Sequence, residues 1–288
     1  MKYLIFGING MAGHVIAQYL KEKGHHVVGV ARQESPICKT IIGDVRNIKD
    51  IEHLLRLIPN YEVAINCIGV LNKYVDEKLS DGIYLNSVFP HLLAEKLKST
   101  RTKLIHISSD CVYEGTKGRY KEKDIPDATS YYGRTKALGE VIDEKNLTIR
   151  TSIVGPELKT NGIGLFHWFM NQSEAVKGYK KVIWSGVTTL QLAKAIEEDT
   201  IKQQTGLYHL VNNDTICKYD LLKFFNRYCR NTPIEITENG TIVSDKSILN
   251  TQEKISFFVP SYEEMVKEMA NWIKKHPELY GQYKEFMR

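Results

Sequence analysis

The stretch Lys2-Tyr3-Leu4-Ile5-Phe6-Gly7-Ile8-Asn9-Gly10-Met11-Ala12-Gly13 decides the fold class of this chain. Its first five residues have the length and apolarity of a buried strand, and a helical pattern of apolar residues follows from Val15 to Lys23. A strand, a glycine turn and a helix in this order are typical of a dinucleotide site, because glycine permits a tight turn and close approach of the backbone to a pyrophosphate. The spacing is Gly-x-x-Gly-x-x-Gly rather than Gly-x-Gly-x-x-Gly, so a simple tight turn is the alternative. The residues expected to bind the cofactor here are Gly7, Asn9, Gly10, Met11 and Gly13.

The second expected strand, His26 to Ala31, indicates which cofactor is used. An NAD-specific site usually carries an acid after this strand, where it binds the ribose 2′-hydroxyl, and this chain has Arg32 instead. The planar, permanently charged guanidinium of arginine suits a 2′-phosphate. We therefore expect NADPH to be preferred, with NADH as the alternative cofactor. A surface arginine in a loop is the plainer interpretation.

Strand-like and helical segments alternate through the first half of the chain, which is typical of right-handed βαβ units and a parallel sheet. This pattern predicts an α/β fold with a Rossmann-type doubly wound sheet and a smaller C-terminal lobe. Residues 1–154 are expected to form the NAD(P)-binding domain and residues 155–288 the substrate-binding lobe, with a strand near 206–211 rejoining the main sheet. The further strands are expected at 40–43, 63–67, 103–108 and 147–151, and the helices at 48–57, 82–99 and 131–144.

Polar residues and glycine follow several of these strands, where ligands of open parallel sheets bind. Such residues also end strands simply because turns need them. Together, however, they would surround one crevice. The candidates are Asp44 and Val45 after the third strand, Cys67, Ile68 and Gly69 after the fourth, and Ser109 and Asp110 after the fifth.

Tyr132 and Lys136 are four residues apart on an expected helix and therefore lie on one face of it. A cation beside a phenol favours the phenolate and lowers its pKa, which would make Tyr132 an acid–base group near neutral pH. The neighbouring Tyr131 lacks this spacing to Lys136. An ordinary amphipathic helix shows the same spacing, so the pair indicates a catalytic site only in combination with the glycine turn before it.

Composition and charge favour an enzyme with small-molecule ligands. The 39 basic and 34 acidic residues are spread along 288 positions without a basic block, which argues against nucleic acid as the main partner. Five cysteines without C-x-x-C spacing indicate neither a disulfide framework nor a zinc site, and no metal is expected. No segment has the length and apolarity of a membrane span, and a strand at residue 2 leaves no room for a signal peptide, so a cytoplasmic location is expected.

The combined motifs resemble the extended short-chain dehydrogenase/reductases over nearly the whole chain. They are the three glycines, the strand-end residues listed above, Asn86 in Tyr-Leu-Asn-Ser-Val-Phe-Pro, the Tyr132/Lys136 pair, and Arg150 to Gly155. The segment from Ile107 to Gly115 is most similar to the dTDP-4-dehydrorhamnose reductase branch. The resemblance implies NADPH-dependent reduction of the C4 ketone of a nucleotide-linked 4-keto-6-deoxy sugar, in cell-surface polysaccharide precursor synthesis. The expected partner is thus a nucleotide-diphosphate sugar, and a homodimer is possible.

The resemblance also implies residue roles. Tyr132 would protonate the developing alkoxide, Ser109 would hydrogen-bond the same oxygen, and Lys136 would hold the nicotinamide ribose while lowering the pKa of Tyr132. Asn86 falls on a cofactor-binding position of the family. Cys111 stands where this branch commonly has tyrosine, and Ser109 where it commonly has threonine, so the sugar is left open.

Further residues could contact the sugar nucleotide. Ser109, Asp110 and Cys111 lie beside the reacting centre by resemblance, and His167 and Trp184 could line the pocket, although such residues more often belong to the core. Two other functions stay open. One is epimerisation on the same fold, whereas dehydration is disfavoured because Asp110 is not followed by glutamate. The other is a non-catalytic binding subunit, since the methionine adenosyltransferase regulatory β subunit resembles this branch.

Overall fold

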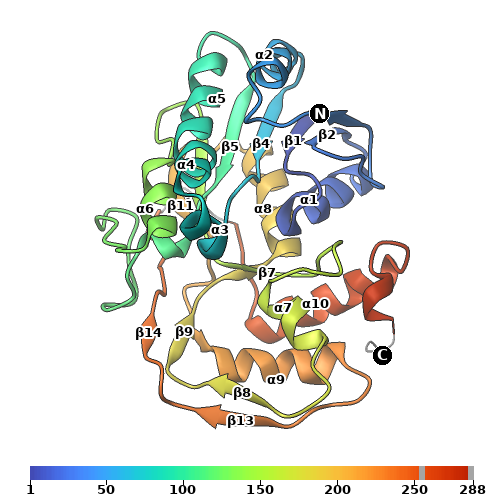
Figure 1. The fold of residues 1–288 in the computed structure, drawn as a ribbon, viewed down its shortest axis with the longest axis vertical. Helices are drawn as coiled ribbons and strands as arrows, with labels where there is room; N and C mark the ends of the chain where they lie inside the picture. The colour runs from blue at the N-terminus through green and yellow to red at the C-terminus, as the bar shows by residue number, and fades with distance from the viewer. Residues whose placement is uncertain (253–256, 285–288) are drawn as a thin grey trace.

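A seven-stranded parallel sheet forms the larger part of the molecule, as Figure 1 shows for the computed structural model, which describes residues 1–252 and 257–284. The strand order is β11-β6-β5-β4-β1-β2-β3. This order confirms the predicted Rossmann-type doubly wound sheet. The strands are β1 (Lys2–Phe6), β2 (His26–Ala31), β3 (Thr40–Ile42), β4 (Val63–Asn66), β5 (Lys103–Ile107), β6 (Leu147–Arg150) and β11 (Gly206–His209).

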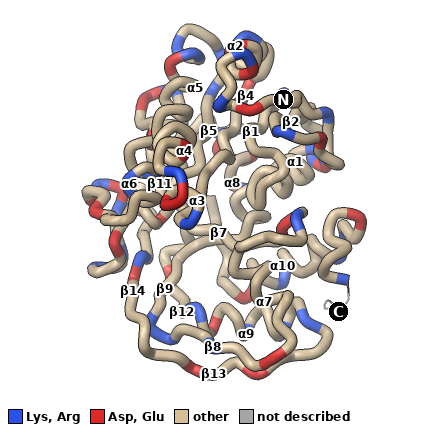
Figure 2. The backbone as a smooth tube through the Cα atoms, in the orientation of Figure 1, with Lys and Arg blue, Asp and Glu red and all other residues tan. Residues whose placement is uncertain are grey.

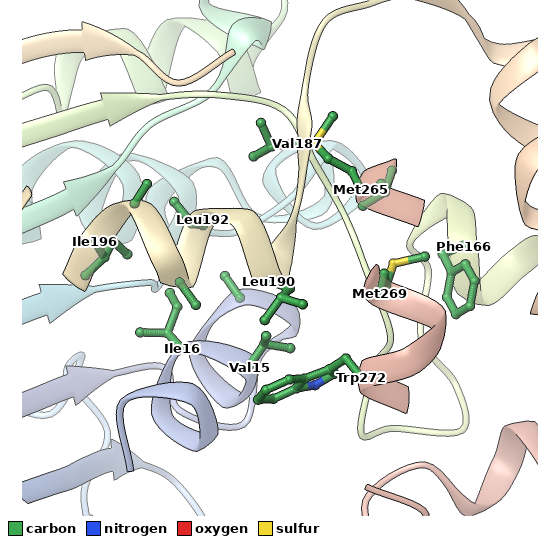
Figure 3. Packing of buried hydrophobic residues seen from close by; sticks show 14 of the residues in the cluster. Val15, Ile16, Phe166, Val187, Leu190, Leu192, Ile196, Met265, Met269 and Trp272 are labelled. Carbon is green, nitrogen blue, oxygen red and sulfur yellow. The ribbon is translucent and has the colours of Figure 1, made fainter. Parts of the chain in front are cut away.

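Alternate residues of β1 point to opposite faces of the sheet and enter two separate hydrophobic clusters. Tyr3 and Ile5 pack with buried side chains of α1 (Met11–Glu22) and α8 (Thr189–Ile201). Figure 3 shows Val15 and Ile16 of α1 facing Leu190 of α8. Leu4 and Phe6 pack on the other face, with α2 (Ile48–Leu57) and α5 (Phe89–Leu97). The helices therefore cover both faces of the sheet, and the carboxyl ends of its strands are left for ligands.

The segment expected as one helix from 82 to 99 is divided in the structure. It consists of α4 (Leu79–Ile83), the π-helical turn η2 (Tyr84–Val88) and α5, and is preceded by the short helix α3 (Asn72–Glu77). A π-turn inside a helix frequently marks a functional site. Here it redirects the chain so that Asn86 is buried beneath the helix that carries Tyr132 and Lys136.

That helix, α6 (Tyr131–Leu138), begins with a Ser130 side chain that accepts a hydrogen bond from Gly133 N at 3.2 Å. The sequence predicted a helix to residue 144, which is wrong. Gly139 is the C-cap, and a Cβ there would lie 1.8 Å from the Asn86 carbonyl oxygen. The helix ends where the chain passes directly over η2, a tertiary contact that local propensity does not encode.

The second half of the chain builds a smaller lobe below the sheet in Figure 1. In Figure 3, Trp272 of its long helix α10 lies near Leu190, Met269 near Phe166 and Met265 near Val187. Our division of the chain at residues 154 and 155 stays a prediction. The lobe's elements are β7 (Ile153–Val154), α7 (Leu165–Met170), β8 (Val176–Tyr179), β9 (Val182–Trp184), β10 (Val187–Thr188), β12 (Ile216–Cys217), α9 (Lys218–Cys229), β13 (Ile236–Asn239), β14 (Ser244–Asp245) and α10 (Tyr262–Lys275).

Charged residues of both signs are dispersed over the sheet domain and the smaller lobe, as Figure 2 shows. Among the described residues, no helix is long and apolar enough to cross a bilayer. In the same part of the chain, no group of three or more His, Cys, Asp or Glu side chains is placed to hold a metal ion.

Candidate active site

The candidate site begins at the point where the strand order reverses. The chain runs from β1 to β2 and β3 on one side and then crosses to β4 on the other, so β1 and β4 are neighbours. Gly7 follows β1 with a φ of +78°, and a Cβ there would lie 3.2 Å from Ile68 N after β4. Ligands of doubly wound sheets bind at such a reversal, beyond the carboxyl ends of the strands.

Two further glycines shape a cradle at the N-terminus of α1. Gly10 N donates to Gly7 O at 2.9 Å, and a Cβ at Gly13 would lie 2.3 Å from the same oxygen, so only glycine fits. No side chain caps the first turn of α1, which leaves backbone N–H groups to face an anion. The residues present fit the pyrophosphate of a dinucleotide.

Asn9 and Met11 lie in the same turn. Asn9 Nδ2 donates to the carbonyl oxygens of Gln33 and Glu34 at 3.2 Å, which ties the turn to the segment after β2. Among the described residues its Oδ1 is buried with no hydrogen-bond partner, an acceptor that a bound nucleotide could satisfy. Met11 Sδ lies 3.1 Å from the position that a Cβ of Gly164 would occupy, so the smaller lobe approaches this turn closely.

The adenosine end of the expected cofactor site is charged. Arg32 is exposed after β2 and lies close enough to Asp44 to help lower the pKa of that carboxyl. The main cause of the lowered pKa is the hydrogen-bonded guanidinium of Arg46, which also pairs with Asp81 at 2.6 Å. Sequence reasoning missed Arg46, which is paired with Asp44 and Asp81. Arg32 is a second cation near Asp44. Val45 is buried, and its carbonyl accepts from Tyr84.

Asn86 does not present its side chain to the crevice. Its Oδ1 accepts from Val70 N at 2.9 Å, and its Nδ2 donates to Val70 O at 3.0 Å and to Thr135 Oγ1 at 3.1 Å. The amide therefore connects the segment after β4, which holds Cys67, Ile68 and Gly69, to helix α6. The cofactor-binding role expected for Asn86 stays a prediction.

The three residues expected to act on the substrate lie together at the carboxyl end of β5. Ser109 Oγ caps the turn that follows β5 by accepting from Cys111 N at 3.1 Å. A hydrogen bond from Ser109 lowers the pKa of Tyr132, so the two hydroxyls are neighbours. Lys136 lies one helical turn further along α6, and its Nζ donates to Ile107 O at 2.7 Å.

The expected effect of Lys136 on Tyr132 is not what the structure shows. The pKa of Tyr132 is raised, chiefly by burial and then by the nearby Cys111 and Asp110. Burial lowers the pKa of Lys136 to about 8, and Glu140 and Cys67 partly oppose the shift. The expectation of a lowered phenol pKa was therefore wrong for this structure, because spacing on a helix does not report desolvation. A phenol with a raised pKa holds its proton and can act as a general acid.

Two lysines of the smaller lobe face the next two residues of the β5 turn. Asp110 is buried, and burial raises its pKa against the opposing effects of Lys218 at the start of α9 and of Lys246 after β14. Burial raises the pKa of the Cys111 thiol to about 12, so the thiol is neutral. Lys218 and Lys246 thus lie near the β5 turn, although they are more than one hundred residues away in the sequence.

Neither His167 nor Trp184 is free to line a sugar pocket. Both ring nitrogens of His167 have partners, Tyr283 Oη at 2.7 Å and Thr160 O at 3.0 Å. Trp184 is buried in the large hydrophobic cluster and packs on Tyr262, with ring centroids 5.7 Å apart. The residues around His167 and Trp184 in the sequence are apolar and aromatic. This pattern is as typical of a hydrophobic core as of a ligand pocket, so the sequence could not decide between the two.

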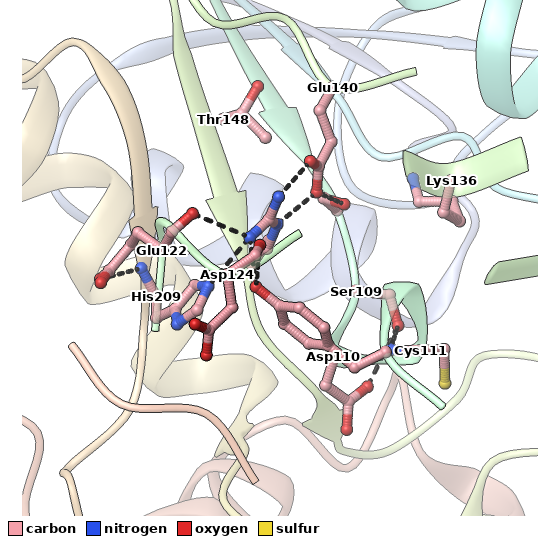
Figure 4. A network of polar contacts seen from close by, with 12 residues as sticks. Ser109, Asp110, Cys111, Glu122, Asp124, Lys136, Glu140, Thr148 and His209 are labelled. Atoms are coloured by element: carbon pink, nitrogen blue, oxygen red, sulfur yellow. Dashed lines mark hydrogen bonds and ion pairs between the residues drawn. The ribbon is translucent and has the colours of Figure 1, made fainter. Parts of the chain in front are cut away.

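A buried ion pair behind the site was not anticipated from the sequence. The Arg150 guanidinium donates to both oxygens of Glu140 at 2.6 Å, and both side chains are almost fully buried. Figure 4 shows Glu122 and His209 on one side of Glu140, and Lys136 and Ser109 of the candidate site on the other. Ser108 Oγ also donates to Glu140 at 2.7 Å. The network fixes the end of β5 against the segment that follows α6.

Comparisons with known proteins agree with this arrangement. The probable low-salt glycan biosynthesis reductase Agl14 of Haloferax volcanii is 33% identical over 144 residues, which is 49% of this chain and 48% of that protein. This chain thus matches about half the length of that relative. Methionine adenosyltransferase 2 subunit beta of Xenopus tropicalis is 25% identical over 76% of this chain and 69% of its own length.

Among solved structures, the dTDP-4-dehydrorhamnose reductase of Bacillus anthracis, in complex with NADP, superposes with a TM-score of 0.78. It is 19% identical and the match covers 95% of this chain and 99% of that one, so it shows a shared fold. Residues 1–271 match the family described as RmlD substrate binding domain. With its sheet, glycine cradle and β5 turn in place, the chain belongs to the RmlD substrate binding domain family.

Proposed function

We propose that this protein reduces the C4 ketone of a nucleotide-linked 4-keto-6-deoxy sugar with NADPH, in the synthesis of cell-surface polysaccharide precursors. One observation carries the proposal: Ser109 and Tyr132 lie next to each other beside a glycine cradle that fits a dinucleotide. The Haloferax relative is described as a glycan biosynthesis reductase, and the Bacillus anthracis structure as an NADP complex. NADH is the alternative cofactor.

Each residue of the candidate site would have a separate role in this reduction. Bound NADPH supplies a hydride to the ketone carbon. Tyr132 donates its proton to the ketone oxygen, and Ser109 hydrogen-bonds the same oxygen as its negative charge develops. Lys136, held by Ile107 O, contributes positive charge behind Tyr132. Arg32 would bind the 2′-phosphate, and Gly7, Gly10 and Gly13 would admit the pyrophosphate.

A non-catalytic binding subunit is the second candidate, and the match to methionine adenosyltransferase 2 subunit beta favours it. Such a subunit would use the glycine cradle but would not depend on a proton donor. Epimerisation on the same fold stays an alternative. The choice between reductase and binding subunit therefore depends on Tyr132.

The deciding experiment follows NADPH absorbance with a panel of nucleotide 4-keto-6-deoxy sugars. Wild type should oxidise NADPH with one member, and Tyr132→Phe should lose on the order of 10²–10⁴ of kcat while still binding NADPH. The matched control is Tyr131→Phe, because Tyr131 is the adjacent, exposed tyrosine of the same helix. If no sugar is reduced although NADPH binds, the binding-subunit and epimerase alternatives replace the reductase. Equal activity of the two variants would also reject the proposed role of Tyr132.

A further inference from the structure

Tyr280 and Tyr283 lie three residues apart, beyond the residues 1–271 that match the family. Both side chains are almost fully buried, and Tyr283 ends the short 3₁₀ turn η4 (Gly281–Tyr283). Each hydroxyl group is hydrogen-bonded, and the two sets of hydrogen bonds lead to different sides of the glycine cradle at the start of α1. We call these two residues the tyrosine pair.

Tyr280 is linked to the cradle through the buried ring of His14. The Gly10 carbonyl can only accept, so His14 Nδ1 carries the ring hydrogen and donates to Gly10 O at 2.8 Å. Burial lowers the pKa of His14 to about 4, so the ring is neutral and its Nε2 accepts from Tyr280 Oη at 3.0 Å. The indole of Trp272 can only donate, and its Nε1 donates to Tyr280 Oη at 3.0 Å. These roles fix one direction for the hydrogen bonds from Trp272 to Gly10.

The orientation of the Gly10 peptide matters for an anion in the cradle. Gly10 O also accepts from His14 N at 3.2 Å. In a planar trans peptide the carbonyl and the following N–H point in opposite directions, so the direction of Gly10 O sets that of Met11 N–H. The first N–H groups of a helix have no partner within it, and they are the groups that bind a phosphate. The link from Tyr280 through His14 therefore orients a donor of the pyrophosphate site.

Tyr283 is linked to the other side of the cradle through the loop at residues 157–164. Its Oη accepts from Glu157 N at 3.1 Å and lies 2.7 Å from His167 Nδ1. His167 Nε2 lies 3.0 Å from Thr160 O, which can only accept, so in the neutral ring Nδ1 accepts the Tyr283 hydrogen. Tyr283 therefore holds the beginning of this loop directly and its middle through His167.

The end of the same loop approaches the cradle. The Glu157 carboxylate accepts from Gly164 N at 2.6 Å, which joins the two ends of the loop. A Cβ on Gly164 would lie 2.8 Å from Glu157 Oε1 and 3.1 Å from Met11 Sδ. The loop therefore packs closely against the turn that carries Met11.

We propose that the tyrosine pair positions the dinucleotide site from two sides: Tyr280 orients the peptide between Gly10 and Met11, and Tyr283 holds the loop at 157–164 against the same turn. Both are positioning residues that act through others and do not touch the cofactor. The inference rests on the dinucleotide cofactor of the proposed function and adds to it two residues from beyond position 271. Deletion of either hydroxyl group should weaken the pyrophosphate subsite and leave the adenosine end unchanged.

Phenylalanine at either position removes the hydroxyl group and keeps the ring. Tyr280→Phe and Tyr283→Phe should each raise the dissociation constant of NADPH on the order of 3–10-fold, as for loss of one or two hydrogen bonds. Adenosine 2′-monophosphate carries the adenosine end of NADPH without the pyrophosphate, and its affinity should not change. In turnover assays, KM for NADPH should rise while kcat is largely kept. Unchanged NADPH affinity, or an equal loss of affinity for adenosine 2′-monophosphate, overturns the inference.

Tyr208→Phe is the matched control, because it also deletes the hydroxyl group of a buried tyrosine. Tyr208 Oη bonds to Asp199, which lies near Lys103 at the start of β5, whereas the cradle lies beyond the carboxyl ends of the strands. We expect this variant to lose thermal stability without a change in NADPH affinity. If it binds NADPH as weakly as the tyrosine-pair variants, the loss of affinity follows stability alone and the inference is overturned.

Amide hydrogen exchange of the free protein gives a readout that needs no ligand. Tyr283→Phe should speed exchange of Glu157 N–H, whose acceptor it removes, and Tyr280→Phe should speed exchange of His14 N–H in the first turn of α1. Unchanged exchange at these two amides overturns the inference. If both variants bind NADPH more weakly but no sugar is reduced, the reductase proposal fails and this inference stands. If the wild type binds no NADPH, both fail.

Discussion

The side chain of Asn86 donates a hydrogen bond to Thr135 Oγ1 at 3.1 Å, across 49 residues of sequence. Thr135 directly precedes Lys136 on α6, and the same amide holds both backbone groups of Val70 beyond β4. The π-turn η2 therefore sets the distance between the segment that approaches the glycine cradle and the helix of Tyr132. Asn86 therefore affects the candidate site indirectly, by fixing the position of α6 relative to the segment after β4.

Replacing Asn86 with alanine should lower both stability and kcat. The change leaves the part-buried N–H and C=O groups of Val70 without their side-chain partner, which costs about 0.5–1.5 kcal/mol of unfolding free energy. Urea unfolding and NADPH oxidation measure the two effects, with Asn60→Ala on the surface as control. A variant with wild-type stability and turnover would show that the hydrogen bonds of the Asn86 side chain are dispensable.

Gly13→Ala should weaken NADPH binding by about tenfold or more, which corresponds to about 1.4 kcal/mol. The added Cβ would lie 2.3 Å from Gly7 O, so the cradle must open. Titration of NADPH fluorescence measures the dissociation constant. Gly281→Ala is the matched control, because no atom lies within 4 Å of the Cβ position there. Equal affinity in both variants would mean that the cradle does not contact the cofactor.

Arg32→Asp should reverse the preference between the two nicotinamide cofactors. Loss of a charge-assisted hydrogen bond to the 2′-phosphate costs about 1.5–3 kcal/mol in kcat/KM for NADPH, with little change for NADH. The control is Arg56→Asp, which makes the same charge change on the exposed surface of α2. An unaltered ratio of the two kcat/KM values would remove Arg32 from the cofactor site.

Glu140→Gln should destabilise the protein by about 3–5 kcal/mol, because it removes the carboxylate that pairs with the buried Arg150 guanidinium. It should also lower the pKa of Lys136 further, since Glu140 raises it. Chemical unfolding at one pH gives the first effect, with the exposed Glu144→Gln as control. A loss under 1 kcal/mol, within the range of a surface ion pair, contradicts this prediction.

Lys136 should impose an alkaline limit on activity. Its pKa is lowered to about 8, so the side chain is charged below that pH and neutral above it. If positive charge behind Tyr132 is needed, kcat/KM falls as the pH rises through about 8. In Lys136→Arg the charge persists, because arginine does not titrate in this range, and the limit should disappear. The folded lysine binds its proton less tightly than the unfolded one, so its contribution to stability rises with pH.

The sheet could be predicted from the sequence because its signals are local. The strand at Lys2 to Phe6, the glycine spacing and the alternation of segments each follow from neighbouring residues, and the structure confirms the resulting fold. The grouping of Ser109 with Tyr132 followed from resemblance, and the structure brings both to one place. Their catalytic roles stay predictions.

What could not be predicted depends on contacts between distant segments. The early end of α6 arises from the close contact of Gly139 with the Asn86 carbonyl, and the approach of Lys218 to Asp110 arises from the packing of the smaller lobe. His167 has Tyr283 as a partner 116 residues away. The raised pKa of Tyr132 reflects burial. None of these effects leaves a pattern in the neighbouring sequence.

The place of β11 in the sheet also constrains how the protein can fold as the ribosome makes it. Gly206–His209 pairs in parallel with Leu147–Arg150, so at least 209 residues must be synthesised before this sheet is complete. Until then β6 exposes an unpaired edge that can associate with other chains. Parallel pairing over such a separation is slow compared with local contacts. Nascent chains of this protein should therefore need protection by a chaperone until the smaller lobe has largely emerged.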